Sequence, residues 1–478
     1  MSQNIIKLNK SRTVLQSFFS DLKEAIGGSE RDFTSIPISK AIILLSIPMV
    51  LEMIMESVFA LVDIFFVSRL GAEAVATVGI TESLMTIVYA IGIGLSVGTT
   101  AMVSRRIGEK RPEKAAVAAV QAIFAGVVVS LLFTAAGIFF SKDLLRLMGA
   151  SESTVESGYM YPAIMLGGNA VIMLLFIINA VFRSSGDAAI SMRVLWFANI
   201  LNIILDPLFI FGWGPFPELG VQGAAVATNI GRGSAVLYQL YLLGRGRFRV
   251  KVRRQQVVIR MREVMKLLKL SLGAIGQNII ATSSWIFLVW VITSLGEEVV
   301  AGYTIAIRIV MFVLLPAWGM ANAAATLVGQ NLGAEKPERA ERSAWIVGIG
   351  NMVLLGLVSI LFVSVPDAFI AFFIDPGMEP LVMESGVTCL RLVSFGFLVY
   401  AIGMVMVHAI NGAGDTRTPI WINFIAFWIL EIPLAFFFVK VLDLQINGVC
   451  YAILLGELAL TLIAIAVFRK GKWKKVKV

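Results

Sequence analysis

The sequence predicts an all-α polytopic membrane protein with twelve transmembrane helices, arranged as two six-helix repeats. Three observations support this class. The 478 residues are 58% hydrophobic and 15% charged, with a mean hydropathy of +0.86, whereas soluble proteins carry about 25% charged residues. Apolar runs of about 20 residues, the length that crosses a bilayer, recur along nearly the whole chain. The basic residues are concentrated in alternate connecting segments, as membrane topology requires.

The predicted spans fall into two halves, with limits at 41–68, 74–100, 115–140, 157–182, 189–213, 221–244, 265–294, 299–326, 342–365, 384–411, 418–440 and 446–468. The expected domains are a cytoplasmic tail at 1–39, an N-lobe at 40–244, a basic cytoplasmic linker at 245–264, a C-lobe at 265–468 and a second basic tail at 469–478. No signal-peptide core with a cleavage site precedes the first span, so that span has to act as the anchor. Residues 14–26 suit either a surface helix or an unstructured tail.

The distribution of charge predicts the orientation. With the N-terminus inside, the cytoplasmic segments hold 33 of the 40 Lys and Arg residues and the outer loops hold four. This pattern is the positive-inside rule, and it places both termini in the cytoplasm. The expected location is the plasma (inner) membrane. Because membrane topology accounts for the net charge of +9, we expect no nucleic acid as a partner. Membrane lipids with anionic headgroups are expected partners.

The two halves repeat when the chain is shifted by 225 residues. Leu70-Gly71 then meets Leu295-Gly296, and residues 107–115 meet 332–340. Six spans per half is an even number, so both halves enter the membrane from the same side as parallel repeats. Transporters built in this way bind substrate between the halves and alternate access. Channels can also be built from repeats.

The sequence lacks the motifs expected for ATP hydrolysis and for a Cys/His metal site. The sequence has no Gly-x-x-x-x-Gly-Lys-[Ser/Thr] motif, so we expect no ATP hydrolysis by this chain. His408 is the only histidine and no Cys/His metal spacing occurs; the histidine is interpreted as a core residue. We therefore expect a protein that is not an enzyme, has no prosthetic cofactor and takes its energy from an ion gradient or a partner protein.

The first span carries Glu52, Glu56 and Asp63 on one helical stripe, together with Pro48. A charge at mid-membrane costs at least about 2.5–3.5 kcal/mol. Three such charges predict a wet cavity, a proton or a bound cation; the alternative is a polar stripe buried against neighbouring helices. Pro48 removes a backbone hydrogen bond and permits either a switchable bend or a fixed kink.

The fifth span places Asn202 and Asp206 one turn apart, and Asp206 and Asp63 are predicted at matching depth in the outer half of the membrane. Paired carboxylates with an amide suit Na⁺ or a shared proton. The alternative is that Asp206, before a proline, marks a helix end. Asn179 and Thr228 are candidates to complete the shell, although each alone is also typical of a helix–helix hydrogen bond.

The second half lacks the same set, because Leu288 stands where Asp63 would repeat. Glu431 is a candidate for attracting a cationic substrate. Glu82 and Glu457 are interpreted as packed polar residues or interface groups.

The chain resembles the multidrug and toxic compound extrusion (MATE) family. The resemblance covers about residues 46–469, and its motifs, taken in order on twelve spans, are specific. The stretches that carry it are 61–71, 182–187, 202–209, 220–228, 328–333 and 411–416, with Pro48 before them.

The resemblance implies two lobes in a V around a central cavity, and export of cationic or amphipathic organic compounds in exchange for H⁺ or Na⁺. In the DinF-like branch the coupling site lies in the N-lobe. The family's functional residues fall here on Pro48, Asp63, Asn179, Asn202, Asp206 and Thr228. The carboxylates that the NorM-like branch adds in the seventh and tenth helices are missing, which favours the DinF-like branch.

Glu52 and Glu56 match no shared motif and are interpreted as cavity-wall residues that favour small organic cations. The leading hypothesis is therefore a cation-coupled multidrug exporter that acts as a monomer. The alternatives are a lipid-linked oligosaccharide flippase of the wider superfamily, and a channel or non-transporting membrane protein.

Overall fold

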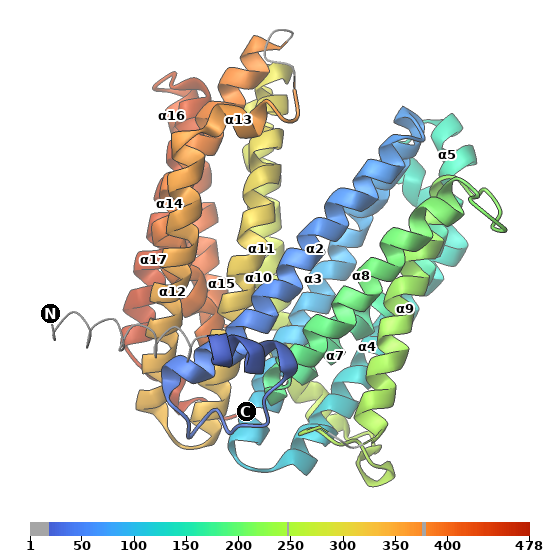
Figure 1. The fold of residues 1–478 in the computed structure, drawn as a ribbon. Helices are drawn as coiled ribbons and strands as arrows, with labels where there is room; N and C mark the ends of the chain where they lie inside the picture. Colours follow the sequence, from blue (N-terminus) through green and yellow to red (C-terminus); the bar gives the residue numbers. More distant parts are fainter. Residues whose placement is uncertain (1–18, 246–247, 375–378) are drawn as a thin grey trace, which may run out of the picture.

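The computed structural model describes residues 19–245, 248–374 and 379–478. Within these ranges the regular structure is helical and no strand occurs (Figure 1). The N-lobe contains α2 (Ile38–Ser68), α3 (Ala72–Gly108), α4 (Pro112–Leu147), α5 (Glu152–Gly158), α6 (Met160–Gly167), α7 (Asn169–Ser185), α8 (Ala188–Ile210) and α9 (Val221–Arg245). The C-lobe contains α10 (Met261–Thr293), α11 (Glu297–Gly333), α12 (Pro337–Ser364), α13 (Pro366–Ile370), α14 (Pro380–Gly412), α15 (Thr418–Asn423), a π-helix (Phe424–Glu431), α16 (Ile432–Lys440) and α17 (Gln445–Arg469).

The prediction of an all-α polytopic membrane protein is confirmed. In the described residues, 11 helical spans are long and apolar enough to cross a membrane. The sixth predicted span, α9, is a 25-residue helix but is not among them, because polar residues such as Gln222, Asn229 and Arg232 interrupt its apolar sequence. It packs along α8 and α7 inside the N-lobe, where Asn229 donates to the backbone oxygen of Ile164 and Arg232 pairs with Glu56.

Two predicted spans are not single α-helices. The fourth is divided at Gly168 into α6 and α7, where a methyl group on Gly168 would overlap the side chain of Asn229. The eleventh consists of α15, the π-helix and α16. Pro433, in the first turn of α16, has no N–H to give to the preceding turn, so the regular α-helical hydrogen bonds cannot continue through this point.

The two lobes form a V (Figure 1). They diverge toward the end that carries α5 and α13 and meet at the end where the C-terminus lies. Glycines let the helices approach closely where the lobes meet: a Cβ on Gly319 of α11 would lie 2.6 Å from the carbonyl oxygen of Met49 on α2. Gly108 of α3 packs in the same way on the backbone of Gln330. We call this end the closed end.

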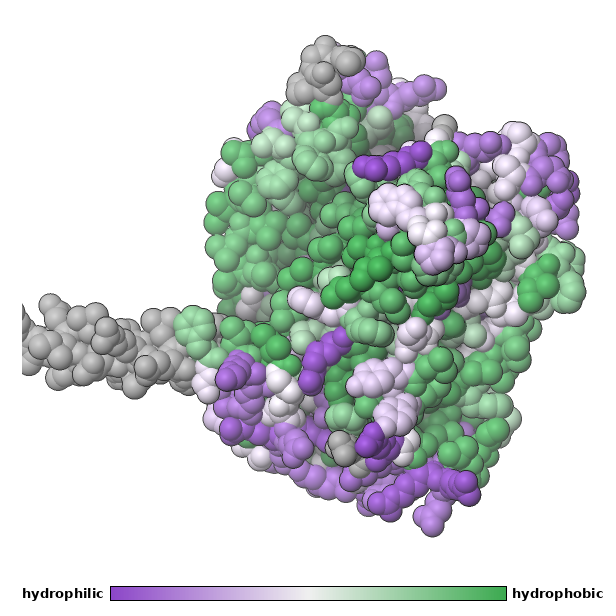
Figure 2. Space-filling view, turned by 45° about the vertical axis from the view of Figure 1, so that its right-hand side comes forward, coloured by the Kyte–Doolittle hydropathy of each residue, from purple (hydrophilic) through white to green (hydrophobic). Residues whose placement is uncertain are grey.

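On the face shown in Figure 2, a belt of apolar residues lies between two polar ends. Leu132, Leu237 and Leu357 are examples of large apolar side chains that are more than half exposed, at 71%, 71% and 65%. Contiguous exposed apolar surface of this kind is expected where lipid, rather than water, is the solvent. The belt therefore marks the part of the molecule that lies in the bilayer.

The terminal segments cross the closed end and bind both lobes. Lys336 donates to the backbone oxygen of Thr34 at 2.8 Å, and Lys110 pairs with Asp32. From the other terminus, the backbone oxygen of Val476 accepts a hydrogen bond of 2.5 Å from Arg105 of α3, and that of Val478 accepts one of 2.8 Å from Arg106. Both segments thus hold the lobes together at this end.

Several helices extend beyond the predicted spans; the second, predicted at 74–100, runs from Ala72 to Gly108. Residues 19–27 are helical, whereas 14–18, the rest of the predicted surface helix, lie outside the described residues. In the predicted linker, residues 248–260 hold one short 3-10 turn (Arg254–Gln256), and α10 already begins at Met261.

Candidate cation site in the N-lobe

Two carboxylates in the N-lobe have oxygens that are buried without a partner. Asp206, near the end of α8, is 0% exposed, and neither of its side-chain oxygens accepts a hydrogen bond. Oδ1 of Asp63, on α2, is likewise buried and unpartnered. The two groups are close enough for their charges to interact. An isolated buried carboxylate is very unfavourable, so this arrangement calls for a proton or a cation.

A neighbouring amide and hydroxyl add oxygen atoms beside Asp206. Asn202 lies one turn before Asp206 on α8 and donates its amide N–H to Oγ1 of Thr228 at 3.2 Å. Its own side-chain oxygen is buried and unpartnered. The set Asp63, Asn202, Asp206 and Thr228 thus offers carboxylate, amide and hydroxyl oxygens, which are the ligands of hard cations. No group of three or more His, Cys, Asp or Glu side chains suited to a metal occurs in the described residues.

Asn179 lies away from this set in the present conformation. Its side-chain oxygen accepts a hydrogen bond of 2.5 Å from Gln239, and its backbone oxygen accepts one from Ser191. Gln239 lies eleven residues after Thr228 on α9, which corresponds to roughly 16 Å along the helix axis. The structure therefore brings together three of the four neutral and acidic partners predicted for Asp63 and leaves Asn179 to a separate hydrogen-bonded pair.

Both glutamates of the first span are neutralised by arginines. Glu52, which is 1% exposed, accepts a hydrogen bond from Nη1 of Arg183 at 3.2 Å. Glu56 accepts one of 2.8 Å from Nη2 of Arg232 and one of 3.1 Å from the side chain of Asn199. The stripe of three acids in α2 is thus divided: the two nearer the closed end are paired, and Asp63 is not.

Arg232 is a site residue that the sequence analysis did not predict. It lies on α9, is 7% exposed and has its guanidinium carbon 5.1 Å from the ring centre of Phe59. Its charge interacts with those of Asp63 and Glu82. The signal was present in the sequence, since Arg232 is one of few basic residues inside a span.

Three further residues from the sequence analysis occupy different settings. Pro48 is buried inside α2, which continues from Ile38 to Ser68, and the next residue packs on Gly319 of α11. Glu431 is 2% exposed within the C-lobe, so in this conformation it does not reach an open cavity. His408 has Nδ1 2.9 Å from the backbone oxygen of Met404, as expected for a core histidine.

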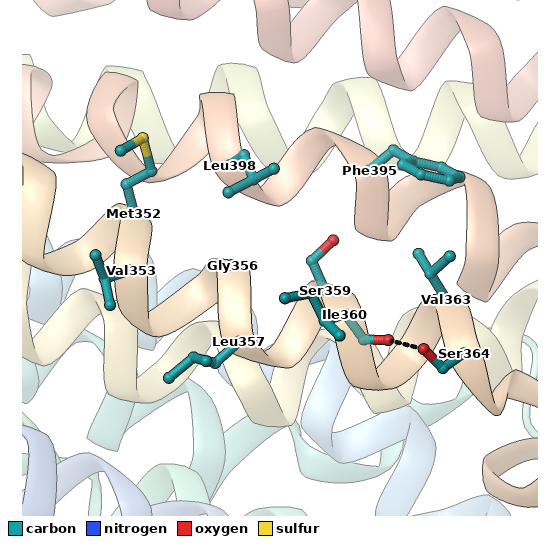
Figure 3. A pocket seen from close by; sticks show the side chains of 10 residues that line it. All are labelled: Met352, Val353, Gly356, Leu357, Ser359, Ile360, Val363, Ser364, Phe395 and Leu398. Atoms are coloured by element: carbon teal, nitrogen blue, oxygen red, sulfur yellow. Dashed lines mark hydrogen bonds between the residues drawn. The ribbon is translucent and has the colours of Figure 1, made fainter.

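Two surface cavities lie elsewhere. One, of about 450 Å³, is an apolar groove between α12 and α14 (Figure 3), with lining residues that include Leu357, Ile360 and Phe395. Its exposed apolar lining suits a lipid acyl chain. The other, of about 870 Å³, lies at the closed end beside Arg105, Arg106 and the last residues of the chain. Neither includes Asp63 or Asp206.

Comparisons with known proteins agree with this architecture. The probable multidrug resistance protein NorM of Thermotoga maritima is 27% identical over 92% of this chain and 94% of its own length. The FAD transporter of Shewanella oneidensis is 28% identical over 84% of this chain and 88% of its own length. A solved structure described as the outward-facing conformation of a multidrug resistance MATE family transporter of the MOP superfamily matches with a TM-score of 0.84 and 26% identity, covering 92% of this chain and 96% of the other.

The family model MatE matches two segments, residues 48–208 and 274–437. These segments cover most of both lobes and include Asp63, Asn202 and Asp206. Together with the two-lobed V, they confirm the resemblance inferred from the sequence motifs. The chain belongs to the MatE family, whose members are membrane transporters and not enzymes.

Proposed function

We propose that this protein is a secondary active exporter that extrudes cationic or amphipathic organic compounds in exchange for H⁺ or Na⁺. The observation that carries the proposal is the pair Asp63 and Asp206: their buried oxygens lack partners, although Arg232 lies close by. Arg232 hydrogen-bonds to Glu56 instead. A mobile cation is then the species that balances the two carboxylates, and its arrival or loss is the event that couples to transport.

The coupling site consists, in this proposal, of Asp63, Asn202 and Asp206, with Thr228 holding the amide of Asn202. These are also the candidate ligands if the ion is Na⁺. Asn179 would join only after a rearrangement of α7 and α9 that separates it from Gln239. No other cofactor is required by the mechanism, because export against a gradient draws on the coupling ion alone.

The alternation of access follows from the same helix. α2 carries Asp63 toward the open end of the V and Pro48 toward the closed end, where α2 packs on α11. Balancing the charge of Asp63 changes how strongly this half of α2 is held against α8 and α9. Pro48, whose missing N–H leaves the helix weaker there, is the proposed point of bending.

The orientation that fits export has both termini in the cytoplasm and the V open to the outside, in the plasma (inner) membrane. The basic segments at the closed end then face the cytoplasm, as the positive-inside rule requires. Multidrug transport in the relatives, and the outward-facing structure among the matches, support this orientation. A single chain supplies both lobes, so the proposed working unit is the monomer.

The substrate is proposed to bind between the lobes. Glu52 and Glu56 were predicted as wall residues that attract cations, but Arg183 and Arg232 balance their charges. Glu56, whose side chain is 26% exposed, is the better remaining candidate for direct contact. The paired charges favour amphipathic compounds of modest charge over strongly cationic ones.

Efflux of a fluorescent organic cation from proteoliposomes, with a Na⁺ or a H⁺ gradient imposed separately, tests the proposal. We expect uphill transport that depends on one of the two gradients and is lost in Asp63→Asn and Asp206→Asn. Glu384→Gln, a change at an exposed position of α14, is the matched control and should transport normally. Normal extrusion by both aspartate variants would refute the coupling site.

The same assay separates the alternatives. A channel or a non-transporting protein gives no gradient-dependent accumulation. A flippase for lipid-linked oligosaccharides would move a labelled lipid across the bilayer and leave the organic cation in place.

A further inference from the structure

The groove between α12 and α14 is an apolar channel on the surface of the C-lobe (Figure 3). Leu357 and Ile360, which line it, are 65% and 66% exposed, and lipid is the solvent expected at apolar surface of this kind. The hydroxyl groups of its lining are used within the protein. That of Ser359 donates to the backbone oxygen of Ser394 at 2.7 Å, and that of Ser364 donates to the backbone oxygen of Ile360 at 2.6 Å. The groove therefore suits an acyl chain rather than a polar ligand.

The length of the groove corresponds to the depth of one leaflet. The groove follows α12 from Met352 to Ser364, a distance of roughly 18 Å at ~1.5 Å per residue. Gly356, between them, lines it without a side chain. The hydrocarbon core of a bilayer is about 30 Å thick, so one leaflet contributes about 15 Å. Ser364 lies at the end nearer α13, which is the open end of the V (Figure 1). An acyl chain in the groove would run from this end toward the middle of the bilayer.

An Arg–Asp pair lies at the open end of this groove. Asp367, in α13, follows the lining residue Ser364 by three positions. Arg391 precedes the lining residue Phe395 by one turn of α14, and residues one turn apart share a helix face. Nη2 of Arg391 lies 3.8 Å from Oδ2 of Asp367, and the two side chains are 47% and 67% exposed. This separation exceeds that of a hydrogen bond, and exposed ion pairs are weak, so a ligand can readily replace either partner.

Two opposite charges side by side are complementary to a zwitterionic lipid headgroup. A phosphate group fits the planar set of N–H donors on the Arg391 guanidinium, and an ammonium group complements the Asp367 carboxylate. A headgroup that carries a phosphate but no amine would leave Asp367 unpaired and close to a like charge. The pair therefore distinguishes headgroups by their charges, whereas the apolar groove beneath it distinguishes only acyl chain from water.

We propose that the groove and this ion pair form a binding site for one zwitterionic glycerophospholipid, in the leaflet at the open end of the V. One acyl chain lies in the groove, the phosphate contacts Arg391 and the ammonium group contacts Asp367. The site lies between α12, α13 and α14 of the C-lobe and includes neither Asp63 nor Asp206. It is therefore independent of the cation site and of the transport activity proposed above.

Photo-crosslinking in vesicles tests the site without relying on transport. The probe is phosphatidylethanolamine with a diazirine on one acyl chain, and labelled residues are identified by mass spectrometry. We expect labelling to concentrate on residues 352–364 and 395–398. It should fall about tenfold in Arg391→Gln/Asp367→Asn, because a hydrogen bond to a charged group contributes about one decade of affinity. Phosphatidylglycerol with the same diazirine, which has the phosphate but no amine, should label the groove less than phosphatidylethanolamine does.

The matched control is Arg146→Gln/Glu152→Gln. It removes an Arg–acid pair at the open end of the N-lobe that is 44% and 70% exposed, and it should leave labelling of the groove unchanged. Three results would overturn the site: labelling spread evenly over the lipid-facing helices, equal labelling by the two lipids, or labelling that persists in Arg391→Gln/Asp367→Asn. Each variant is first shown to be monodisperse, and both substituted pairs are exposed, so a failure to fold is not expected to obscure the outcome.

Discussion

The ion pair between Glu52 and Arg183 gives a quantitative test of the structure. The side chains are 1% and 9% exposed, and the pair joins α2 to α7 at 3.2 Å. Replacing Arg183 with Met preserves volume but leaves the Glu52 carboxylate buried with no other hydrogen bond, and Glu56 close by adds repulsion. Breaking a buried pair in this way costs about 3–5 kcal/mol. Since Oε2 of Glu52 is unpartnered even in the intact pair, we expect the low end, about 3 kcal/mol.

The assay is a double-mutant cycle on equilibrium unfolding in detergent, with Arg183→Met, Glu52→Gln and the double variant. Each single change should destabilise by about 3 kcal/mol, and the double variant should recover most of the loss, because replacing both partners of a buried pair is often neutral. Lys142→Met is the control: its pair with Glu156 is 38% and 61% exposed, so it should cost less than about 1 kcal/mol. A similarly small loss for Arg183→Met would refute the reasoning.

The terminal segments at the closed end yield two further predictions. Burial favours the protonated form of Asp32, but hydrogen bonds from Lys110 and Thr34 outweigh it and lower the pKa of Asp32 to about 2. Because this lies below the value of about 3.9 in an unfolded chain, its stabilising contribution is complete above about pH 4 and is lost as the pH falls through 2. Asp32→Asn should therefore lower the thermal midpoint at pH 7, and the difference from the wild type should shrink toward pH 2; an equal difference at both would contradict this. Deleting residues 476–478 removes the backbone acceptors of Arg105 and Arg106, so a cysteine placed at the buried Ala413 should react faster with a maleimide, whereas Lys477→Ala leaves those acceptors in place and should not change the rate.

The sequence predicted the fold well because the relevant signals are local or repeat regularly. Spans follow from apolar runs, and the two halves follow from one shift of 225 residues. The apolar pattern predicted spans less well where a helix directs polar side chains into the protein interior. α9 carries Thr228 and Arg232 toward its neighbours, so its composition alone does not identify it as a span. The division of the eleventh span by a π-helix depends on a proline whose effect on hydrogen bonding is visible only in the backbone.

The site was predicted in part. Asp63, Asn202 and Asp206 could be related because they sit at matching depth on two helices that run in the same direction. Asn179 was expected in their shell, and the structure pairs it with Gln239. Glu82 was interpreted as a packed polar residue or interface group, and its charge also interacts with those of Asp63 and Arg232. These differences arise because depth follows from position along one helix, whereas contact depends on which faces of different helices meet.

The amino-acid sequence by itself determined that the chain is a membrane protein, how its helices are spaced and which residues carry charge into the bilayer. The tertiary structure decided which of those charges are balanced. Glu52 meets Arg183 across 131 residues and Glu56 meets Arg232 across 176, while no ion pair joins Asp63 or Asp206 to a basic side chain in the described residues. A lone acid and a paired acid look the same in one sequence, because the partner comes from another helix. Only packing shows that two of the three acids in α2 are neutralised and that a buried oxygen of the third has no hydrogen-bond partner.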